Sequence, residues 1–331
     1  MLFKKNKKSN YLLGLDLTNT TIKILELSKR KQQYQVENYF IAHLNQNDHS
    51  IETLIQNDTL SLKNILSEHL KNICFNTANA AIAIADNNIM NKIVRFDKSC
   101  TDEEIENQIA LDYMKYFSPL TEAINYDFYH LGKSRQYPDC IDIWITAVKK
   151  ALVNNCIKAL SEINLHVATF DIASLAIIRA CHMIPAITAY IENNHLFAVI
   201  NINPRQATLS IYHHAIPLLT RTISLTSFDN NTHTTENPLP SQSILTQQMQ
   251  QILESFYANY HSDPVKHLLI CGDGCNSVAL CAHLNAEFNI PCSVANPFCN
   301  VSFADHCDSQ ILLQQAHQWM ICCGLAMRTS D

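Results

Sequence analysis

Asp16 and Lys23 are the first residues whose types and spacing could do chemistry. They flank the turn in GLDLTNTTIKILEL, residues 14 to 27, where the apolar pattern predicts a strand, a tight turn and a second strand. A carboxylate and an amine beside such a turn are groups that hold Mg²⁺ and phosphate oxygens. The turn at 18–21 has no glycine, although glycine would let backbone N–H groups approach a phosphate.

Hydroxyl and amide side chains occupy this turn instead. Thr18, Asn19 and Thr20 can donate hydrogen bonds to phosphate oxygens, so with Asp16 and Lys23 they are candidate nucleotide-binding residues. Asp16 is also the candidate for holding Mg²⁺ through a water molecule. The alternative interpretation is an ordinary hairpin without a ligand.

A second strand, turn and strand around VINI and TLSI repeats the spacing. Alignment of the two stretches places Asn201 with Asp16 and Asn203 with Thr18, which makes both asparagines candidates for the same site. An amide therefore replaces the carboxylate, and Pro204 removes a backbone donor where donors are needed. Arg205 adds a positive charge, but a side chain is a poor substitute for a rigid backbone. Hydrolysis needs a carboxylate that holds metal or activates water, so we expect no fast ATP turnover.

The stretch CGDG at 271–274 follows an apolar strand pattern. Gly272 and Gly274 would let an adenosine lie against the backbone. A strand-to-helix turn that needs glycine for its own shape explains the same pair, and the pair alone favours that second interpretation. The sequence contains no Gly-x-Ser-x-Gly elbow, no His-Glu-x-x-His and no Walker loop, so no competing catalytic set is predicted.

Composition limits the classes of partner. The chain has 331 residues and a formal net charge of -6, which gives no general attraction to nucleic acid. Its basic run holds four lysines near the start, which predict either an exposed arm or a weak attraction to anionic lipid: Lys4, Lys5, Lys7 and Lys8. The 13 cysteines include no metal-type CxxC pairs and predict free thiols in a reducing compartment. No segment is apolar for long enough to predict a membrane span.

The order of predicted elements indicates a duplicated α/β fold. Three consecutive strands are predicted over YLLGLDL, TIKILEL and QYQVENYFIAHL, and HLFAVINI, TLSIYHH and LLTRTISL repeat that opening. Two related lobes with a cleft between them follow from this repeat. We also predict a capping box at Thr101–Glu104, a helix capped by Ser241, and one closing helix over ILLQQAHQWMICCGLAMR.

These elements suggest three parts. The first lobe is predicted over 1–92, with 165–190 and 309–331 returning to it. A small α+β insert is predicted over 93–164, with its own sheet and two helices. The second lobe is predicted over 191–308 and includes a small helical subdomain around 228–262.

Several segments together resemble a known family. GLDLTNTTIKILELS resembles the opening of the PilM family of actin-like proteins of type IV pilus assembly, with Gly14, Asp16, Lys23, Glu26 and Leu27 in matching positions. TFDIASLAIIRA, LTQQMQQILESFYANY, LLICGDGCNSVALCAHLNAEFNIPCSVANPF and CCGLAMR resemble later segments of that family, in the same order.

The resemblance implies an actin-like, ribonuclease H-like duplicated ATPase fold with an inserted subdomain, as in the division protein FtsA. It implies a cytoplasmic ring or platform associated with the inner membrane, which binds the N-terminal tail of PilN in a groove between the first lobe and the insert, together with other platform proteins. It also implies ATP and Mg²⁺ as ligands. Thr18, Asn201 and Asn203 depart from the family's glycine, acid and glycine, and Asp273 interrupts its glycine run, so we expect a degenerate nucleotide site.

Three other functions stay open. An active actin-like ATPase would use Asp16 and Lys23. The cytoplasmic part of a type II secretion platform protein shares the fold, but it usually continues into a membrane helix. A sugar kinase of the same superfamily needs a catalytic aspartate and glycine-rich turns, which the sequence does not provide.

Overall fold

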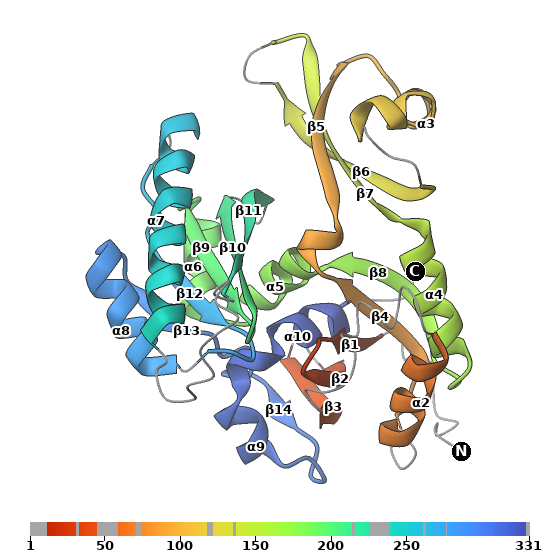
Figure 1. Ribbon diagram of the computed structural model, residues 1–331, viewed down its shortest axis with the longest axis vertical. Coiled ribbons are helices and arrows are strands. Elements are labelled where there is room, and N and C mark those ends of the chain that lie inside the picture. Colours follow the sequence, from red (N-terminus) through yellow and green to blue (C-terminus); the bar gives the residue numbers. More distant parts are fainter. Residues whose placement is uncertain are drawn as a thin grey trace, which may run out of the picture. The chain divides into compact units, whose positions relative to one another are not determined.

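The computed structural model describes most of the chain (Figure 1). The described residues are 12–30, 33–44, 59–70, 75–117, 122–134, 137–213, 216–225, 239–260, 263–275 and 277–328. The lysine-rich run near the start and residues 226–238 lie outside them.

The chain divides into two compact units, which are described separately. Unit 1 comprises Met1–Asp48, Leu70–Asp86 and His166–Asp331, and unit 2 comprises His49–His69 and Asn87–Leu165. The predicted boundaries of the lobes, the insert and the helical subdomain stay predictions.

The first sheet of unit 1 has six strands in the order β14-β3-β2-β1-β4-β8. These strands are β1 (Leu13–Leu17), β2 (Thr21–Arg30), β3 (Gln33–His43), β4 (Asn79–Ile84), β8 (His166–Ile172) and β14 (Ser302–Phe303). β1, β2 and β3 pair antiparallel, whereas β4 pairs parallel with both β1 and β8. The predicted opening of three consecutive strands is confirmed.

The second sheet of unit 1 repeats this arrangement. Its order is β11-β10-β9-β12-β13, and its strands are β9 (Phe197–Ile202), β10 (Gln206–His213), β11 (Ile216–Ser224), β12 (Leu268–Cys271) and β13 (Cys292–Val294). β9, β10 and β11 pair antiparallel, and β12 joins β9 in parallel. The order β3-β2-β1-β4 therefore recurs as β11-β10-β9-β12, with the same strand directions, as the internal repeat predicts.

Helices α5 (Ala173–Cys181), α6 (Pro185–Glu192) and α10 (Met320–Ala326) supply much of the core of unit 1. α5 and α10 approach each other at backbone distance because residue 324 is glycine. A Cβ atom at Gly324 would lie 1.8 Å from the carbonyl oxygen of Ala176, which real structures do not tolerate. This close packing fixes α10 next to β1 and β2.

Helices α7 (Leu239–Tyr260) and α8 (Ser277–Phe288) belong to the core of the second sheet. The helical spacing of apolar residues in LTQQMQQILESFYANY predicts one inward face of α7, formed by Leu245, Met249, Ile252, Leu253, Phe256 and Tyr260. Four of these six residues are buried, whereas Ile252 is half-buried and Tyr260 is exposed. The predicted cap at Ser241 is wrong, because the helix already begins at Leu239 and places a proline in its first turn, a position where proline is tolerated.

The closing segment is broken, although one continuous helix was expected. It consists of α9 (Ser309–Gln314), the 3₁₀ turn η2 (Ala316–Trp319) and α10. The break lets the carbonyl oxygen of His317 accept a hydrogen bond of 3.0 Å from the backbone N–H of Gly272, and Trp319 is buried in the core. Both are contacts with distant parts of the chain, which the local helical pattern does not contain.

Unit 2 has a three-stranded antiparallel sheet in the order β5-β7-β6. Its strands are β5 (Met90–Asp97), β6 (Ile124–Lys133) and β7 (Cys140–Lys149), and its helices are most of α2 (Thr59–Leu70), α3 (Asp102–Tyr116) and α4 (Lys150–Ser161). The predicted capping box is confirmed, because Thr101 Oγ1 accepts from the Glu104 N–H and Glu104 Oε2 accepts from the Thr101 N–H.

Within the described residues, we find no individual helix whose length and apolar character would suffice to cross a bilayer. Helices α5 and α6 meet that criterion only as a pair, and they are bent by 101° at the break between them.

Candidate functional site

The turn between β1 and β2 satisfies most of its own backbone hydrogen-bond donors. The backbone N–H of Thr18 donates to the Thr21 carbonyl at 2.9 Å. The N–H groups of Thr20 and Thr21 both donate to Thr18 Oγ1, at 3.3 and 2.9 Å, while the Asn19 side chain is exposed. Three of the four backbone donors that a phosphate could use in this turn are therefore engaged within the turn itself.

Asp16 and Lys23 face each other across the β1–β2 ladder, where they are directly paired residues. Opposite residues of an antiparallel pair point to the same side of a sheet. The Lys23 Nζ lies 3.7 Å from Asp16 Oδ2, and the side chains are only 1% and 7% exposed. A charged pair from the first sheet is thus buried at the base of the turn.

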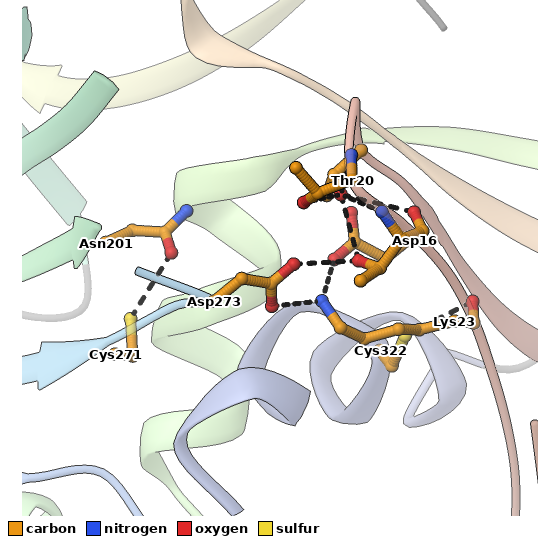
Figure 2. A network of polar contacts seen from close by, with 9 residues as sticks. Asp16, Thr20, Lys23, Asn201, Cys271, Asp273 and Cys322 are labelled. Carbon is orange, nitrogen blue, oxygen red and sulfur yellow. Dashed lines mark hydrogen bonds and ion pairs between the residues drawn. The ribbon is translucent and has the colours of Figure 1, made fainter. Parts of the chain in front are cut away.

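Asp273 is the third member of this cluster (Figure 2). Its Oδ1 accepts a hydrogen bond of 2.5 Å from Lys23 Nζ, and its Oδ2 accepts one of 2.7 Å from Thr21 Oγ1. The Asp273 side chain comes from the turn after β12, in the second sheet, and is 8% exposed. One carboxylate thus links the hairpin of the first sheet to the turn of the second.

The pKa values reflect this crowding of charge. Burial raises the pKa of Asp16 from 3.8 to about 6; Lys23 opposes this rise and Asp273 adds to it. Burial acts to lower the pKa of Lys23, but the carboxylates of Asp16 and Asp273 outweigh it, so the pKa of Lys23 is raised. The lysine therefore stays charged, and its ammonium group is paired with two acidic side chains of the chain.

The turn between β9 and β10 provides fewer groups that could bind a phosphate or a metal ion than the turn between β1 and β2 does. The Oδ1 atom of Asn201 accepts a hydrogen bond of 3.8 Å from the Cys271 thiol. The backbone N–H of Asn203 donates to the Gln206 carbonyl at 2.8 Å, and Pro204 has no N–H. Arg205 is exposed, and it does not belong to the residues that line the cavity at this site.

Gly272 and Gly274 are explained by close packing of the β12 turn against the end of β9. Gly272 has φ +100°, and a Cβ atom there would lie 2.3 Å from the Ile202 carbonyl oxygen. The backbone N–H of Gly274 donates to that same oxygen at 2.8 Å. The fold itself requires glycine at 272, as the second interpretation of CGDG predicted.

The cavity at this site has a volume of about 10 Å³. A single water molecule needs roughly 10 to 15 Å³ on this measure, so the space barely holds one. Its lining residues are Asp16, Lys23, Asn201, Asn203, Gly272, Asp273, His317, Gln318, Met320 and Ile321. Within the described ranges, no three His, Cys, Asp or Glu side chains are arranged to hold a metal ion.

Five of the nine predicted site residues meet at this cavity. They are Asp16, Lys23, Asn201, Asn203 and Gly272. The three turn residues 18–20 and Gly274 do not line it. Sequence reasoning missed the role of Asp273, which it treated only as an interruption of a glycine run. The signal that could have revealed this role was an acidic residue between two glycines, since a buried lysine elsewhere in the chain needs an acid to pair with.

Comparison with known proteins identifies the family. A family model described as type IV pilus assembly protein PilM matches residues 14–227 and 230–330. The chain belongs to the PilM family. A solved PilM–PilN type IV pilus biogenesis complex contains a chain 17% identical to this one, with a TM-score of 0.77, and the match covers 97% of this chain and 99% of that one. This PilM-family member has the actin-like fold.

Two more distant structures match over most of their length. A Bacteroides thetaiotaomicron protein with an actin-like ATPase fold is 12% identical with a TM-score of 0.48, over 92% of this chain and 96% of that one. The ethanolamine utilization protein EutJ of Carboxydothermus hydrogenoformans is 9% identical with a TM-score of 0.49, over 98% and 91%.

Proposed function

We propose that this PilM-family chain acts in type IV pilus assembly as a scaffold that binds the N-terminal tail of a PilN-type partner, and that its nucleotide site is degenerate. The family match over almost the whole chain supports the pilus role. The similar chain of the PilM–PilN complex supports a PilN-type partner. A peripheral position at the cytoplasmic side of the inner membrane, a ring-like assembly and contacts with other platform proteins belong to the same proposal.

The main observation in support of a degenerate nucleotide site is the contact of Asp273 with Lys23. The Asp273 carboxylate takes the ammonium that would otherwise face a phosphate, at 2.5 Å. A phosphate brought to about 4 Å from this carboxylate would meet a repulsion of about 4 kcal/mol per pair of unit charges at an effective dielectric constant of 20. A triphosphate would therefore have to displace Asp273 before it could use Lys23.

The surrounding groups favour the same conclusion. Three of the four N–H groups of the Thr18–Thr21 turn donate to oxygen atoms of the same turn. The second turn offers Asn201 in place of an acid, and the cavity, at about 10 Å³, holds about one water molecule. Asp16 and Asp273 are the acids at this cavity that could hold Mg²⁺, and Lys23 Nζ lies 3.7 Å from the first and 2.5 Å from the second. A metal ion would therefore compete with the Lys23 ammonium for both carboxylates.

An active ATPase is the second candidate, because Asp16, Lys23, Asn201 and Gly272 still converge on one cavity. In that case Asp16→Ala would abolish ATP affinity while the protein stays folded. In the proposed function the same variant leaves the already negligible ATP affinity unchanged.

Calorimetric titration of the full chain tests the proposal. One titration uses a synthetic peptide of the N-terminal tail of the PilN-type protein from the same organism, and a peptide of the same composition in scrambled order is the control. A second titration uses ATP with Mg²⁺, followed by a phosphate-release assay. We expect saturable binding of the tail peptide only, with neither ATP binding nor phosphate release. Tight ATP binding with turnover, and no affinity for the tail, would refute the proposed function.

A further inference from the structure

Two cysteine side chains of unit 1 lie almost within bonding distance of each other. The Sγ atoms of Cys281 and Cys292 are 3.0 Å apart. A disulfide bond measures about 2.05 Å, so the sulfurs need to approach by about 1 Å, which small side-chain rotations supply. Other described thiols donate to oxygen atoms instead, namely those of Cys271, Cys299, Cys307 and Cys322.

Regular elements, not loops, position this thiol pair. Cys281 lies in α8, and Cys292 is the first residue of β13, which pairs in parallel with β12 opposite Leu268. α8 packs against β13 (Figure 1). The chain reverses between them at Asn289, whose φ of 52° lies in the left-handed region that asparagine tolerates. The pair is therefore held by the fold.

Both thiols are reachable from solution. Cys281 and Cys292 are partly exposed, whereas Cys181 and Cys323 are buried. Burial, reinforced by the hydrogen bond with Cys281, raises the pKa of the Cys292 thiol. Cys292 therefore stays protonated at neutral pH.

We propose that Cys281 and Cys292 form a redox-active pair, which hydrogen peroxide converts into a disulfide that ties α8 to the edge strand β13. First, the Cys281 sulfur attacks one peroxide oxygen as its own proton leaves; the O–O bond breaks and the departing hydroxide takes up that proton, which leaves a sulfenic acid and one water. Then the Cys292 sulfur attacks that of Cys281 as its proton leaves; the S–O bond breaks and the hydroxide departs as a second water. Two thiols and one peroxide give one disulfide and two waters, and exchange with a small thiol reverses the reaction.

The bond would restrain the part of the second sheet that carries Asp273. The β12 strand, the Asp273 turn, α8 and β13 follow one another in sequence, and the disulfide closes the last two on each other. β13 has three residues and lies at the edge of its sheet, so it is expected to open readily when reduced. Its backbone amides should exchange at least tenfold more slowly in the oxidised protein.

Peptide mapping of the full chain tests the pair directly. The reduced protein is treated with hydrogen peroxide, its remaining thiols are blocked by alkylation, and it is cut with chymotrypsin without reduction. No Lys or Arg lies between residues 281 and 292, but Phe288 does, so cleavage after Phe288 separates the two cysteines. We expect the two peptides to stay joined, with a mass lower by two hydrogens than the sum of the free peptides, and to separate on reduction.

Two variants serve as matched controls. Cys299→Ser removes an exposed thiol elsewhere in unit 1 and should leave the linkage intact. Cys292→Ser should abolish the linkage and leave a Cys281 sulfenic acid that dimedone traps. Oxidation of Cys299 shows that the peroxide has acted; if Cys281 and Cys292 of the same wild-type protein are nevertheless found alkylated, the proposal is overturned. A disulfide from either cysteine to Cys275 would also overturn it. The wild-type map decides the question even if the Cys292→Ser variant fails to fold.

Discussion

The Lys23 side chain is 1% exposed, and its ammonium group lies between two carboxylates. Removing a charge from water costs several kcal/mol, so such a lysine persists only when acids and hydrogen bonds compensate it. Asp16 alone, at 3.7 Å, is too distant for a strong hydrogen bond, and Asp273 supplies the short one. Asp273 thus provides within the chain the negative charge that a bound phosphate would bring.

The pKa of Asp16 leads to a prediction about stability and pH. An acid whose pKa is about 6 when folded and 3.8 when unfolded binds its proton more tightly in the folded state. Its contribution to stability is therefore largest below pH 3.8 and is lost as the pH rises through 6. The variant Asp16→Asn lacks this dependence. We expect the unfolding free energy of the variant, relative to wild type, to rise by about 2 kcal/mol between pH 4 and pH 7.

Urea unfolding measures this difference. The chain has two tryptophans; Trp319 is buried in the core of unit 1, so a Trp144→Phe background gives a fluorescence signal for unit 1 alone. Asp86, whose pKa burial also raises to about 6, is present in both proteins and cancels. Parallel stability curves for Asp16→Asn and wild type would contradict the prediction.

The candidate site shows which residues a sequence can reveal. Asp16 and Lys23 were predictable because both belong to one hairpin, where register alone places them opposite each other. Asp273 was not, because its partner Lys23 lies 250 residues earlier in the chain. A local pattern identifies CGDG as a turn, but it does not state what that turn faces.

At the level of elements, short-range patterns predicted most strands and helices of both units. They worked where one periodicity and one cap determine an element, as in the three opening strands and the Thr101 capping box. They failed for the closing segment, where apolar residues continue at helical spacing but the backbone breaks at η2. The break serves contacts of His317 and Trp319 with distant residues, and tertiary contacts override a helical tendency that is worth only tenths of a kcal/mol per residue.

The capping box gives a prediction for helix α3. Thr101→Ala removes the side-chain oxygen that accepts from the Glu104 N–H, and the loss of such a cap costs about 1 kcal/mol. We expect the amides in the first turn of α3 to exchange with solvent about fivefold faster, as measured by hydrogen exchange and mass spectrometry. Ser99→Ala is the matched control, since it also removes a hydroxyl hydrogen bond, to Asp97, but no helix cap. Equal exchange in the two variants would mean that the capping box does not stabilise α3.

On the scale of the whole molecule, the repeated sheets of unit 1 explain why the cluster lies where it does. Each sheet presents its first hairpin turn, after β1 or β9, at the same place in the repeat. In the first hairpin the chain keeps an acid and a lysine, while the second has Asn201 and Asn203, and Asp273 comes from the turn after β12. The ion pair and hydrogen bond of Asp273 hold the two sheets together without a ligand.

Removing that internal link should reopen a site for an anion. Asp273→Gly frees Lys23 and Thr21, and it creates three consecutive glycines whose backbone can approach a phosphate. Asp273→Asn is the matched control, because it keeps the size of the side chain and removes only its charge. We expect ATP with Mg²⁺, or pyrophosphate, to leave the Tm of wild type unchanged and to raise that of Asp273→Asn less than that of Asp273→Gly, because Asn removes the charge but keeps the side chain in the way. Ligand at 100 times its Kd stabilises a protein by about 2.7 kcal/mol, so the Tm of Asp273→Gly should rise by roughly 5 to 10 °C. A rise in wild type would show that Asp273 does not exclude the nucleotide. No rise in either variant would show that the degeneration of the second hairpin, and not Asp273, is what abolishes binding.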